Sequence, residues 1–171
     1  TQSTLKVVGA FHGLSRQRSD ARRYPAIDPL DSWSTYPGQV DREQIEAMHE
    51  LLQHSNDIDQ MMKVVGEEGT PLEDFVIYLK GEFLDQVYLQ QDAFDPVDGA
   101  TTLKRQSYVF DRLHSFLQTS MTFADKDAAR SFFQKLTQAT IDWNRLAMDS
   151  DDFHHQEKRL EQLVADVTDY A

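Results

Sequence analysis

A succession of capped, amphipathic segments from Asp41 onward constrains the fold of this chain more than any other feature. Asp41 can cap a helix whose apolar residues recur on one face. Thr70, Pro71 and Glu73 predict a helix start with a capping box. A break in that helix is expected near Gly81. The apolar positions that define the helices are Ile45, Met48, Leu51 and Leu52; Phe75, Val76, Leu79, Phe83, Leu84 and Val87; Leu103, Phe110, Leu113, Leu117 and Met121; Ala128, Phe132, Leu136, Trp143 and Leu146; and Leu160, Leu163, Val164 and Val167. The sequence therefore predicts a mainly α fold, a helical bundle.

The N-terminal section contains the single short strand that the sequence predicts. Residues 4–11 are rich in β-branched and aromatic side chains. A lone strand leaves its backbone donors and acceptors unsatisfied, so we expect its sheet to lie in polypeptide upstream of Thr1. Residues 15–23 predict a short polar helix, which ends before Pro25 because proline disfavours the α region in the residue before it. The prolines of residues 24–30 then predict a rigid, extended turn that can present side chains.

Charge is distributed unevenly along the 171 residues. Seventeen basic and 29 acidic side chains give a formal net charge of −12. Residues 1–40 contain five basic and three acidic side chains, a net charge of +2, so residues 41–171 carry −14. The change of sign coincides with the turn-forming residues 36–38. We therefore divide the chain into a short N-terminal section and an acidic helical body.

The composition excludes several classes of function. With no cysteine, the chain has no disulfide, zinc ribbon or catalytic thiol. Its negative charge repels nucleic acid and anionic lipid. No apolar run approaches the roughly 20 residues that are needed to cross a bilayer. We therefore expect a soluble, cytoplasmic chain with no nucleic-acid partner and no direct membrane insertion.

Neither a nucleotide-hydrolysing site nor a metal site is predicted from the residues alone. Phosphate-binding loops end in Lys-Ser or Lys-Thr, whereas residues 66–69 place two glutamates where phosphate would have to lie. His154 and His155 are adjacent, and neighbouring side chains on a helix point about 100° apart, so they cannot converge on a metal. His49 and His54 are five residues apart and also lie on different faces. We therefore expect no catalytic residue and no metal ligand in this chain.

Two groups of side chains have both a functional and a structural interpretation. The arginines of residues 16–23 can bind an anion or nucleic acid, but the acidity of the remaining chain favours a solvated face or an interface. Tyr24 and Phe94 each lie at a break in predicted helix, beside a proline or an Asp-Pro pair, where a ring can project. Their spacing alone favours core or half-buried turn residues.

Three stretches of the sequence resemble one known family. Residues 1–8 (TQSTLKVV) and 22–34 (RRYPAIDPLDSWS) closely resemble the catalytic A (alpha) subunit of V/A-type rotary ATPases just after its nucleotide-binding core. Residues 89–98 (LQQDAFDPVD) resemble the signature of that subunit's helical C-terminal domain. F-type catalytic subunits carry a motif near-identical to the second stretch, so the third stretch favours the V/A type. The resemblance implies that residues 1–40 end the nucleotide-binding domain and that residues 41–171 form the helical C-terminal domain.

The resemblance also implies site residues and cofactors. Tyr24 and Phe94 match the two aromatic positions beside adenine in that family, where stacking contributes on the order of 1–3 kcal/mol each. Gln90 and Gln91 match residues that line the same pocket. The full-length protein would bind ATP or ADP with Mg²⁺. The family's phosphate loop, magnesium ligand and catalytic glutamate lie upstream of Thr1, so we expect this chain alone to be inactive.

Partners follow from the same resemblance. In that family the A subunit alternates with B subunits in a hexamer around a central shaft. The resemblance thus implies B subunits and central shaft subunits as partners, and a cytoplasmic location peripheral to the membrane. It also implies that the helical domain moves with the nucleotide cycle and couples ATP hydrolysis or synthesis to proton or sodium transport.

A second interpretation stays open at this point. A free-standing acidic helical adaptor would bind a basic protein partner through residues 41–171 and would have no nucleotide role. It predicts a well-paired or absent strand at residues 4–11. The rotary-ATPase interpretation predicts instead that this strand is disordered or pairs with another copy of the chain.

Overall fold

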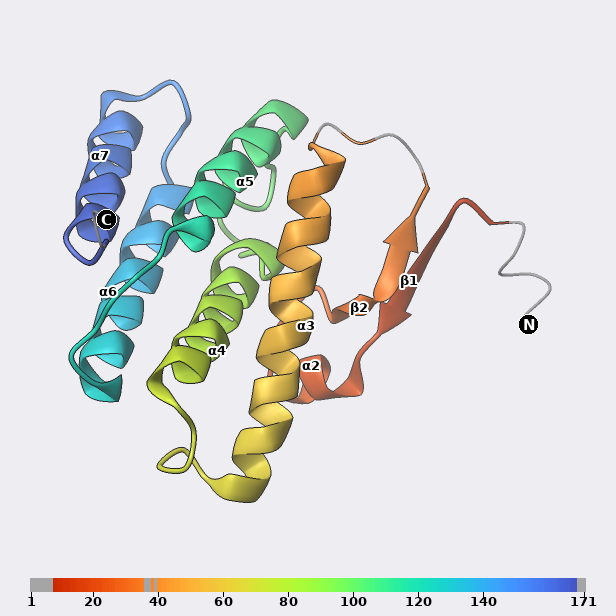
Figure 1. The fold of residues 1–171 in the computed structure, drawn as a ribbon. Coiled ribbons are helices and arrows are strands. Elements are labelled where there is room, and N and C mark those ends of the chain that lie inside the picture. Colours follow the sequence, from red (N-terminus) through yellow and green to blue (C-terminus); the bar gives the residue numbers. More distant parts are fainter. Residues whose placement is uncertain (1–7, 36–37, 39, 169–171) are drawn as a thin grey trace.

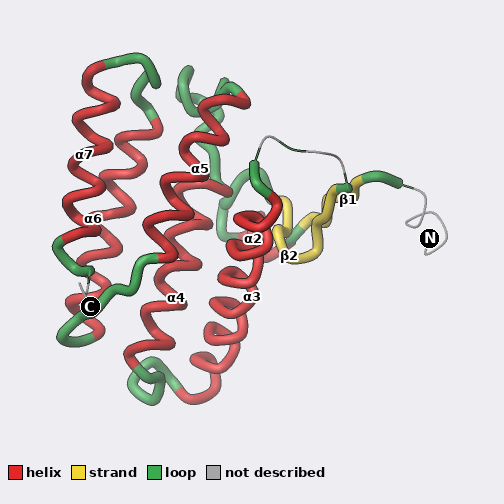
Figure 2. The backbone as a smooth tube through the Cα atoms, turned by 45° about the horizontal axis from the view of Figure 1, so that its top comes forward, coloured by secondary structure: helices red, strands yellow, loops and turns green. Residues whose placement is uncertain are grey.

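The computed structural model describes residues 8–35, 38 and 40–168, which form a helical bundle with a small β-hairpin at one side (Figure 1). The elements in chain order are strand β1 (Ala10–Leu14), helix α2 (Arg16–Asp20), strand β2 (Ile27–Ser34), helices α3 (Arg42–Val65) and α4 (Leu72–Leu84), the π-helical turn η1 (Asp85–Leu89), and helices α5 (Leu103–Gln118), α6 (Lys126–Asn144) and α7 (Asp151–Ala165). The hairpin and α2 lie beside α3, on the side of the bundle away from α6 and α7 (Figure 2). The prediction of a mainly α bundle is confirmed.

The two strands pair with each other, which corrects the expectation of a lone strand. β1 and β2 are antiparallel, with Phe11 opposite Trp33 and Leu14 opposite Ile27, and the register is irregular between the two pairs. Residues 4–7 of the expected strand at residues 4–11 lie outside the described residues. Residues 27–30, the first half of the partner strand, belong to the stretch for which Pro25 and Pro29 predict a rigid, extended turn. In a two-stranded hairpin each strand has an edge without a partner, so a proline is tolerated there.

Side chains cap the helices largely as the sequence predicts. Asp41 accepts a hydrogen bond from the backbone N–H of Glu43 at 2.7 Å, which confirms the predicted start of α3. The starts of α5, α6 and α7 are capped in the same way by Thr102, Asp125 and Ser150. These contacts satisfy backbone donors that have no partner inside their helices.

The predicted capping box at Thr70 is wrong. α4 begins at Leu72, after Pro71, without a side-chain cap. The Thr70 hydroxyl instead donates to the carbonyl of Gly66 at 3.1 Å, just beyond the end of α3. Gly66 has a φ of 78°, a conformation that favours glycine, and Thr70 is only 3% exposed. The threonine therefore stabilises the end of one helix rather than the beginning of the next.

The expected break near Gly81 is also wrong, because α4 runs through this residue without interruption. The glycine instead allows α3 and α4 to approach each other closely. Four residues further on, the helix changes to the π-helical turn η1, which ends at Leu89. Such turns occur mostly as single turns, frequently at functional sites.

The core lies among α4, α5, α6 and α7. The rings of Trp143 and Phe153 stack with centroids 4.7 Å apart, and the Trp143 indole Nε1–H donates to the Phe153 carbonyl at 3.1 Å. Leu113, Leu136 and Leu160 are completely buried around them. These residues come from three helices, so the predicted apolar faces of the second half of the chain meet in one core.

Candidate functional site

A backbone hydrogen bond joins the two motifs that carry the resemblance. The N–H of Gln91 donates to the carbonyl of Tyr24 at 3.1 Å, across 67 residues of sequence. Tyr24 follows α2, and Gln91 lies just beyond η1. The fold thus brings residues 22–34 and 89–98 side by side at this point.

The candidate side chains near this contact are exposed. Tyr24 is 53% exposed and Phe94 is 98% exposed, while Gln90 and Gln91 are also on the surface. Phe94 is therefore not a core residue, which corrects the interpretation from spacing alone. No ring contact joins Tyr24 to Phe94 among the described residues. The structure brings the two segments together without stacking the two rings.

The loop that carries Phe94 is ordered by its own carboxylates. An Asp98 oxygen accepts the N–H of Asp92 at 2.7 Å, and an Asp92 oxygen accepts the N–H of Phe94 at 3.1 Å. An Asp95 oxygen accepts the N–H groups of Val97 and Asp98 at 2.8 and 2.9 Å. The backbone N–H of Asp98, followed by that of Val97, stabilises the ionised carboxylate of Asp95 and so lowers the pKa of Asp95. The loop therefore presents the Phe94 ring from a fixed backbone.

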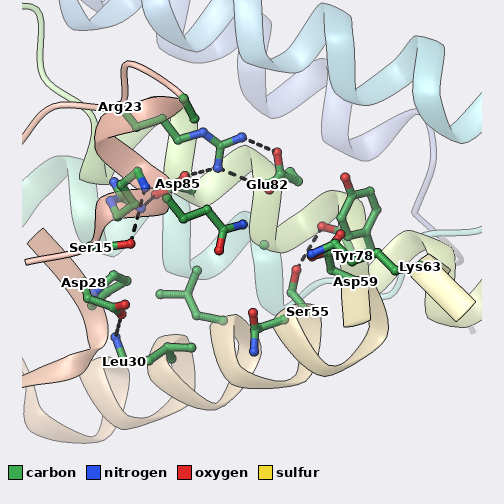
Figure 3. Close-up of a pocket in the computed structure, with 17 residues that line it drawn as sticks. Ser15, Arg23, Asp28, Leu30, Ser55, Asp59, Lys63, Tyr78, Glu82 and Asp85 are labelled. Carbon is green, nitrogen blue, oxygen red and sulfur yellow. Dashed lines mark hydrogen bonds and ion pairs between the residues drawn. The ribbon is translucent and has the colours of Figure 1, made fainter. Parts of the chain in front are cut away.

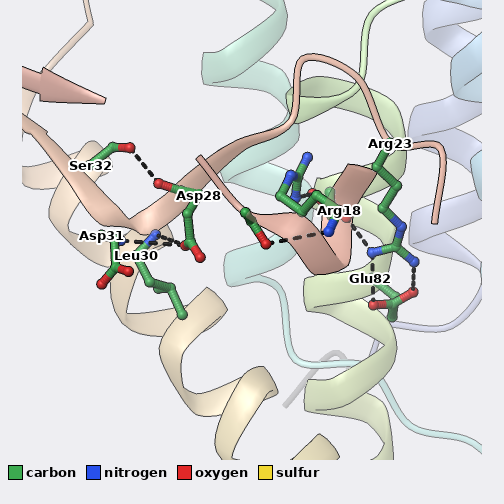
Figure 4. Close-up of polar contacts among 9 residues, drawn as sticks. Arg18, Arg23, Asp28, Leu30, Asp31, Ser32 and Glu82 are labelled. Carbon is green, nitrogen blue, oxygen red and sulfur yellow. Dashed lines mark hydrogen bonds and ion pairs between the residues drawn. The ribbon is translucent and has the colours of Figure 1, made fainter. Parts of the chain in front are cut away.

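A cluster of ion pairs lies beside the Tyr24 segment (Figure 4). Arg23 Nη2 contacts Glu82 Oε2 at 2.7 Å, and both Arg18 and Arg23 pair with the carboxylate of Asp85. The hydrogen bond with Glu82, with the nearby charges of Glu82 and Asp85, raises the pKa of Arg23 above its ordinary value despite partial burial. Two of the four arginines in residues 16–23 thus serve an internal interface. The sequence favoured an interface or a solvated face for them.

A cleft of about 340 Å³ adjoins this cluster, between the N-terminal section and helices α3 and α4 (Figure 3). Its charged lining consists of Arg18, Arg23, Lys63, Asp28, Asp59, Glu82 and Asp85. Carboxylates outnumber cations there, so the lining does not favour phosphate. Neither Tyr24 nor Phe94 lines the cleft. Sequence reasoning missed it because its walls are distant in the chain.

No group of three or more histidine, aspartate or glutamate side chains in the described part of the chain is arranged to hold a metal ion. Among the helices in the described ranges, none is both long enough and apolar enough to cross a membrane.

The chain belongs to the family described as the C-terminal domain of V and A type ATP synthase, whose model matches residues 42–129. This match covers α3, α4, η1 and α5. It therefore includes Asp85 in η1 and the loop between η1 and α5, which contains Gln90, Gln91 and Phe94. The family assignment favours the rotary-ATPase interpretation over the adaptor, although the pairing of β1 with β2 is the feature that the adaptor predicts.

Relatives extend the similarity to nearly the whole chain. A V-type ATP synthase alpha chain from Treponema denticola is 53% identical over 99% of this chain. A V-type ATP synthase alpha chain from Borreliella afzelii and alpha chain 1 from Treponema pallidum are 51% and 52% identical over 96% of it. The chain spans only 28–29% of the length of these relatives.

A solved structure shares the fold. The ATP synthase subunit NeqB from Nanoarcheaum equitans matches 70% of this chain, and 30% of its own chain, with a TM-score of 0.57. The sequence identity is 16%, so this likeness supports the architecture of the bundle and nothing finer.

Proposed function

We propose that this chain is the C-terminal part of the catalytic subunit of a V/A-type rotary ATPase, in which it completes the adenine pocket. Tyr24 and Phe94 would lie against the base, and Gln90 and Gln91 would line the same region. The observation that carries the proposal is the hydrogen bond between the Tyr24 carbonyl and the Gln91 N–H, which joins two segments distant in sequence. Exposed aromatic rings beside this contact are suited to stack on a base and exclude water.

The upstream part of the subunit would supply the chemistry. ATP or ADP with Mg²⁺ would bind there through a phosphate loop, and this chain alone would not turn over nucleotide. B subunits and central shaft subunits are the proposed partners, in a soluble sector peripheral to the membrane. Nucleotide binding and release would tilt the helical domain against the shaft and couple ATP hydrolysis or synthesis to proton or sodium transport.

The proposal is tested by Tyr24→Ala in the full-length subunit. Loss of stacking on one base predicts about tenfold weaker nucleotide binding, since such contacts are worth about 1–3 kcal/mol. Because Tyr24 is half exposed, we expect only a small loss of folding stability. Equilibrium binding of a fluorescent ATP analogue measures the first quantity, and thermal unfolding measures the second.

Trp33→Ala is the matched control. Trp33 is also an exposed aromatic residue of the N-terminal section, at 40% exposure, but it lies on β2, away from the Tyr24–Gln91 contact. Its removal should leave nucleotide affinity unchanged. If Tyr24→Ala binds nucleotide as tightly as the wild type, Tyr24 is not part of the pocket and the proposal is wrong.

A further inference from the structure

We propose that Asp85 is a positioning residue that holds the two segments of the adenine pocket at a fixed separation. This inference rests on the proposed function. Asp85 is buried whereas both rings are exposed, and no motif of the sequence singles it out. Its place in the fold, at the junction of α4 and η1, connects it to both segments.

The contacts of Asp85 close a ring around the junction. Its carboxylate pairs with Arg23, which is bonded covalently to Tyr24. The Tyr24 carbonyl accepts the N–H of Gln91 at 3.1 Å, and the N–H of Gln90 donates to the Asp85 carbonyl at 3.0 Å. Every link in this ring is a covalent bond, a hydrogen bond or an ion pair. The distance between the Tyr24 and Gln91 segments is therefore set from two sides.

Burial makes the ionic link the strong part of this ring. The Asp85 side chain is 7% exposed, and the side chains of its partners Arg23 and Arg18 are 28% and 11% exposed. A buried carboxylate requires charged or hydrogen-bonding partners, because an unpaired buried charge is strongly unfavourable. α2, which carries Arg18 and precedes Arg23, buries none of its residues. Apolar packing of α2 therefore does not fix the Tyr24 segment, and the ion pairs of Arg18 and Arg23 with Asp85, together with that of Arg23 with Glu82, do.

The ring also transmits displacement. Asp85 begins η1, and Gln90 directly follows this turn. A shift of the end of α4 is passed through η1 to Gln91 and through the Arg23 ion pair to Tyr24. Both sides of the pocket thus move with α4 as one body.

The test compares two ligands of the full-length subunit in its complex. Asp85→Asn keeps the size of the side chain and removes its charge, which weakens the contacts with both arginines. We expect about tenfold weaker binding of Mg-ATP, the size of effect typical of coupled neighbours. Binding of magnesium tripolyphosphate, which has no base, should be unchanged. If Asp85 only stabilised the fold, Asp85→Asn would weaken the binding of both ligands to the same extent.

Two further variants sharpen the test. Asp20→Asn is the matched control, because Asp20 pairs with Arg16 on α2 at the surface, with side chains 71% and 93% exposed. It should leave ATP affinity unchanged. Arg23→Gln removes the ion pair with Asp85 and also the contacts with Glu82, so it should weaken ATP binding at least as much as Asp85→Asn. The double variant should lose less affinity than the sum of the two single effects, because both changes remove the link between Arg23 and Asp85.

The outcomes separate this inference from the proposed function. Equal weakening of ATP and tripolyphosphate, or unchanged ATP binding by Asp85→Asn, would overturn the positioning role. Tyr24→Ala is measured alongside. If Tyr24→Ala leaves ATP affinity unchanged, the pocket itself is wrong and this inference falls with it. If Tyr24→Ala weakens ATP binding and Asp85→Asn does not, the pocket stands and the positioning role alone is wrong.

Discussion

Gly81 of α4 packs directly against Ser55 of α3. A Cβ atom at Gly81 would lie 2.2 Å from the Ser55 hydroxyl oxygen and 2.3 Å from its Cβ, and Ser55 is 6% exposed. The Ser55 hydroxyl donates to the Tyr78 carbonyl at 3.2 Å and so has little freedom to move. The contact fixes the spacing of the two helices that lead to the candidate site.

Gly81→Ala should therefore destabilise the chain. Alanine is favoured over glycine inside a helix by about 1 kcal/mol, but overpacking costs about 1–3 kcal/mol, so we expect a small net loss. Urea unfolding measures it. Adding Ser55→Gly removes the atoms in the way and should recover part of the stability. A more stable Gly81→Ala variant would show that the helices can separate without penalty.

Trp143→Phe should destabilise the core by about 2–3 kcal/mol. The change leaves a cavity and removes the donor to the Phe153 carbonyl, in a position where Trp143 is completely buried. Trp33→Phe is the control, because this residue is 40% exposed, and its effect should stay below about 0.5 kcal/mol. Thermal unfolding of both variants makes the comparison, and equal effects would contradict the assignment of the core.

Tyr88 makes folding stability depend on alkaline pH. Burial raises the pKa of its hydroxyl from 10.0 to about 12, and a hydrogen bond with Gln106 opposes this only in part. Above pH 10 the unfolded chain loses this proton before the folded chain does, so stability decreases with rising pH until about pH 12. At pH 11 the titration of Tyr88 should lower the free energy of unfolding by about 1 kcal/mol. Urea unfolding at pH 9 and pH 11 should show a smaller decrease in Tyr88→Phe, and an equal decrease in both proteins would contradict the shift.

The helices of the body were predictable because their signals are local. Apolar residues at helical spacing and a cap such as Asp41 lie within a few residues of each other, and the structure confirms that helix start. The prediction at Thr70 is wrong because its hydroxyl bonds to Gly66, an alternative that the capping pattern does not reveal. A glycine inside a helical pattern indicates a break, whereas Gly81 in fact contacts Ser55. A one-dimensional pattern does not reveal such packing between helices.

The candidate site was predictable only in part. The resemblance predicts that Tyr24 and Gln91 line one pocket, but the hydrogen bond between their segments depends on the tertiary fold. Arg23 and Asp85 are 62 residues apart in a chain rich in charges, so no pattern pairs them before their burial is known. Ionic contacts of this kind form only once the fold has brought the two side chains together. Helix periodicity, in contrast, is present in the sequence and helps to determine the fold.

Arg105 anchors the loop that carries Phe94 to the bundle. Its side chain is buried, with Nη2 2.6 Å from the Asn144 carbonyl and Nη1 3.2 Å from the Thr101 hydroxyl. It therefore binds the end of α6 and the end of the loop at once. Burial lowers the pKa of Arg105, and the nearby charges of Asp98 and Asp95 oppose this effect.

Arg105→Gln should loosen this loop. The shorter side chain cannot make both contacts, and it leaves the Asn144 carbonyl without this donor, so we expect a loss of about 1–3 kcal/mol. Amide hydrogen exchange in residues 90–102 should become faster, while exchange in the middle of α7 stays slow. Lys104→Gln is the control. Lys104 precedes Arg105 in the sequence but has an exposed side chain, so this change should leave the loop unaltered. Unaltered exchange in Arg105→Gln would mean that the carboxylate hydrogen bonds within the loop hold Phe94 in place on their own.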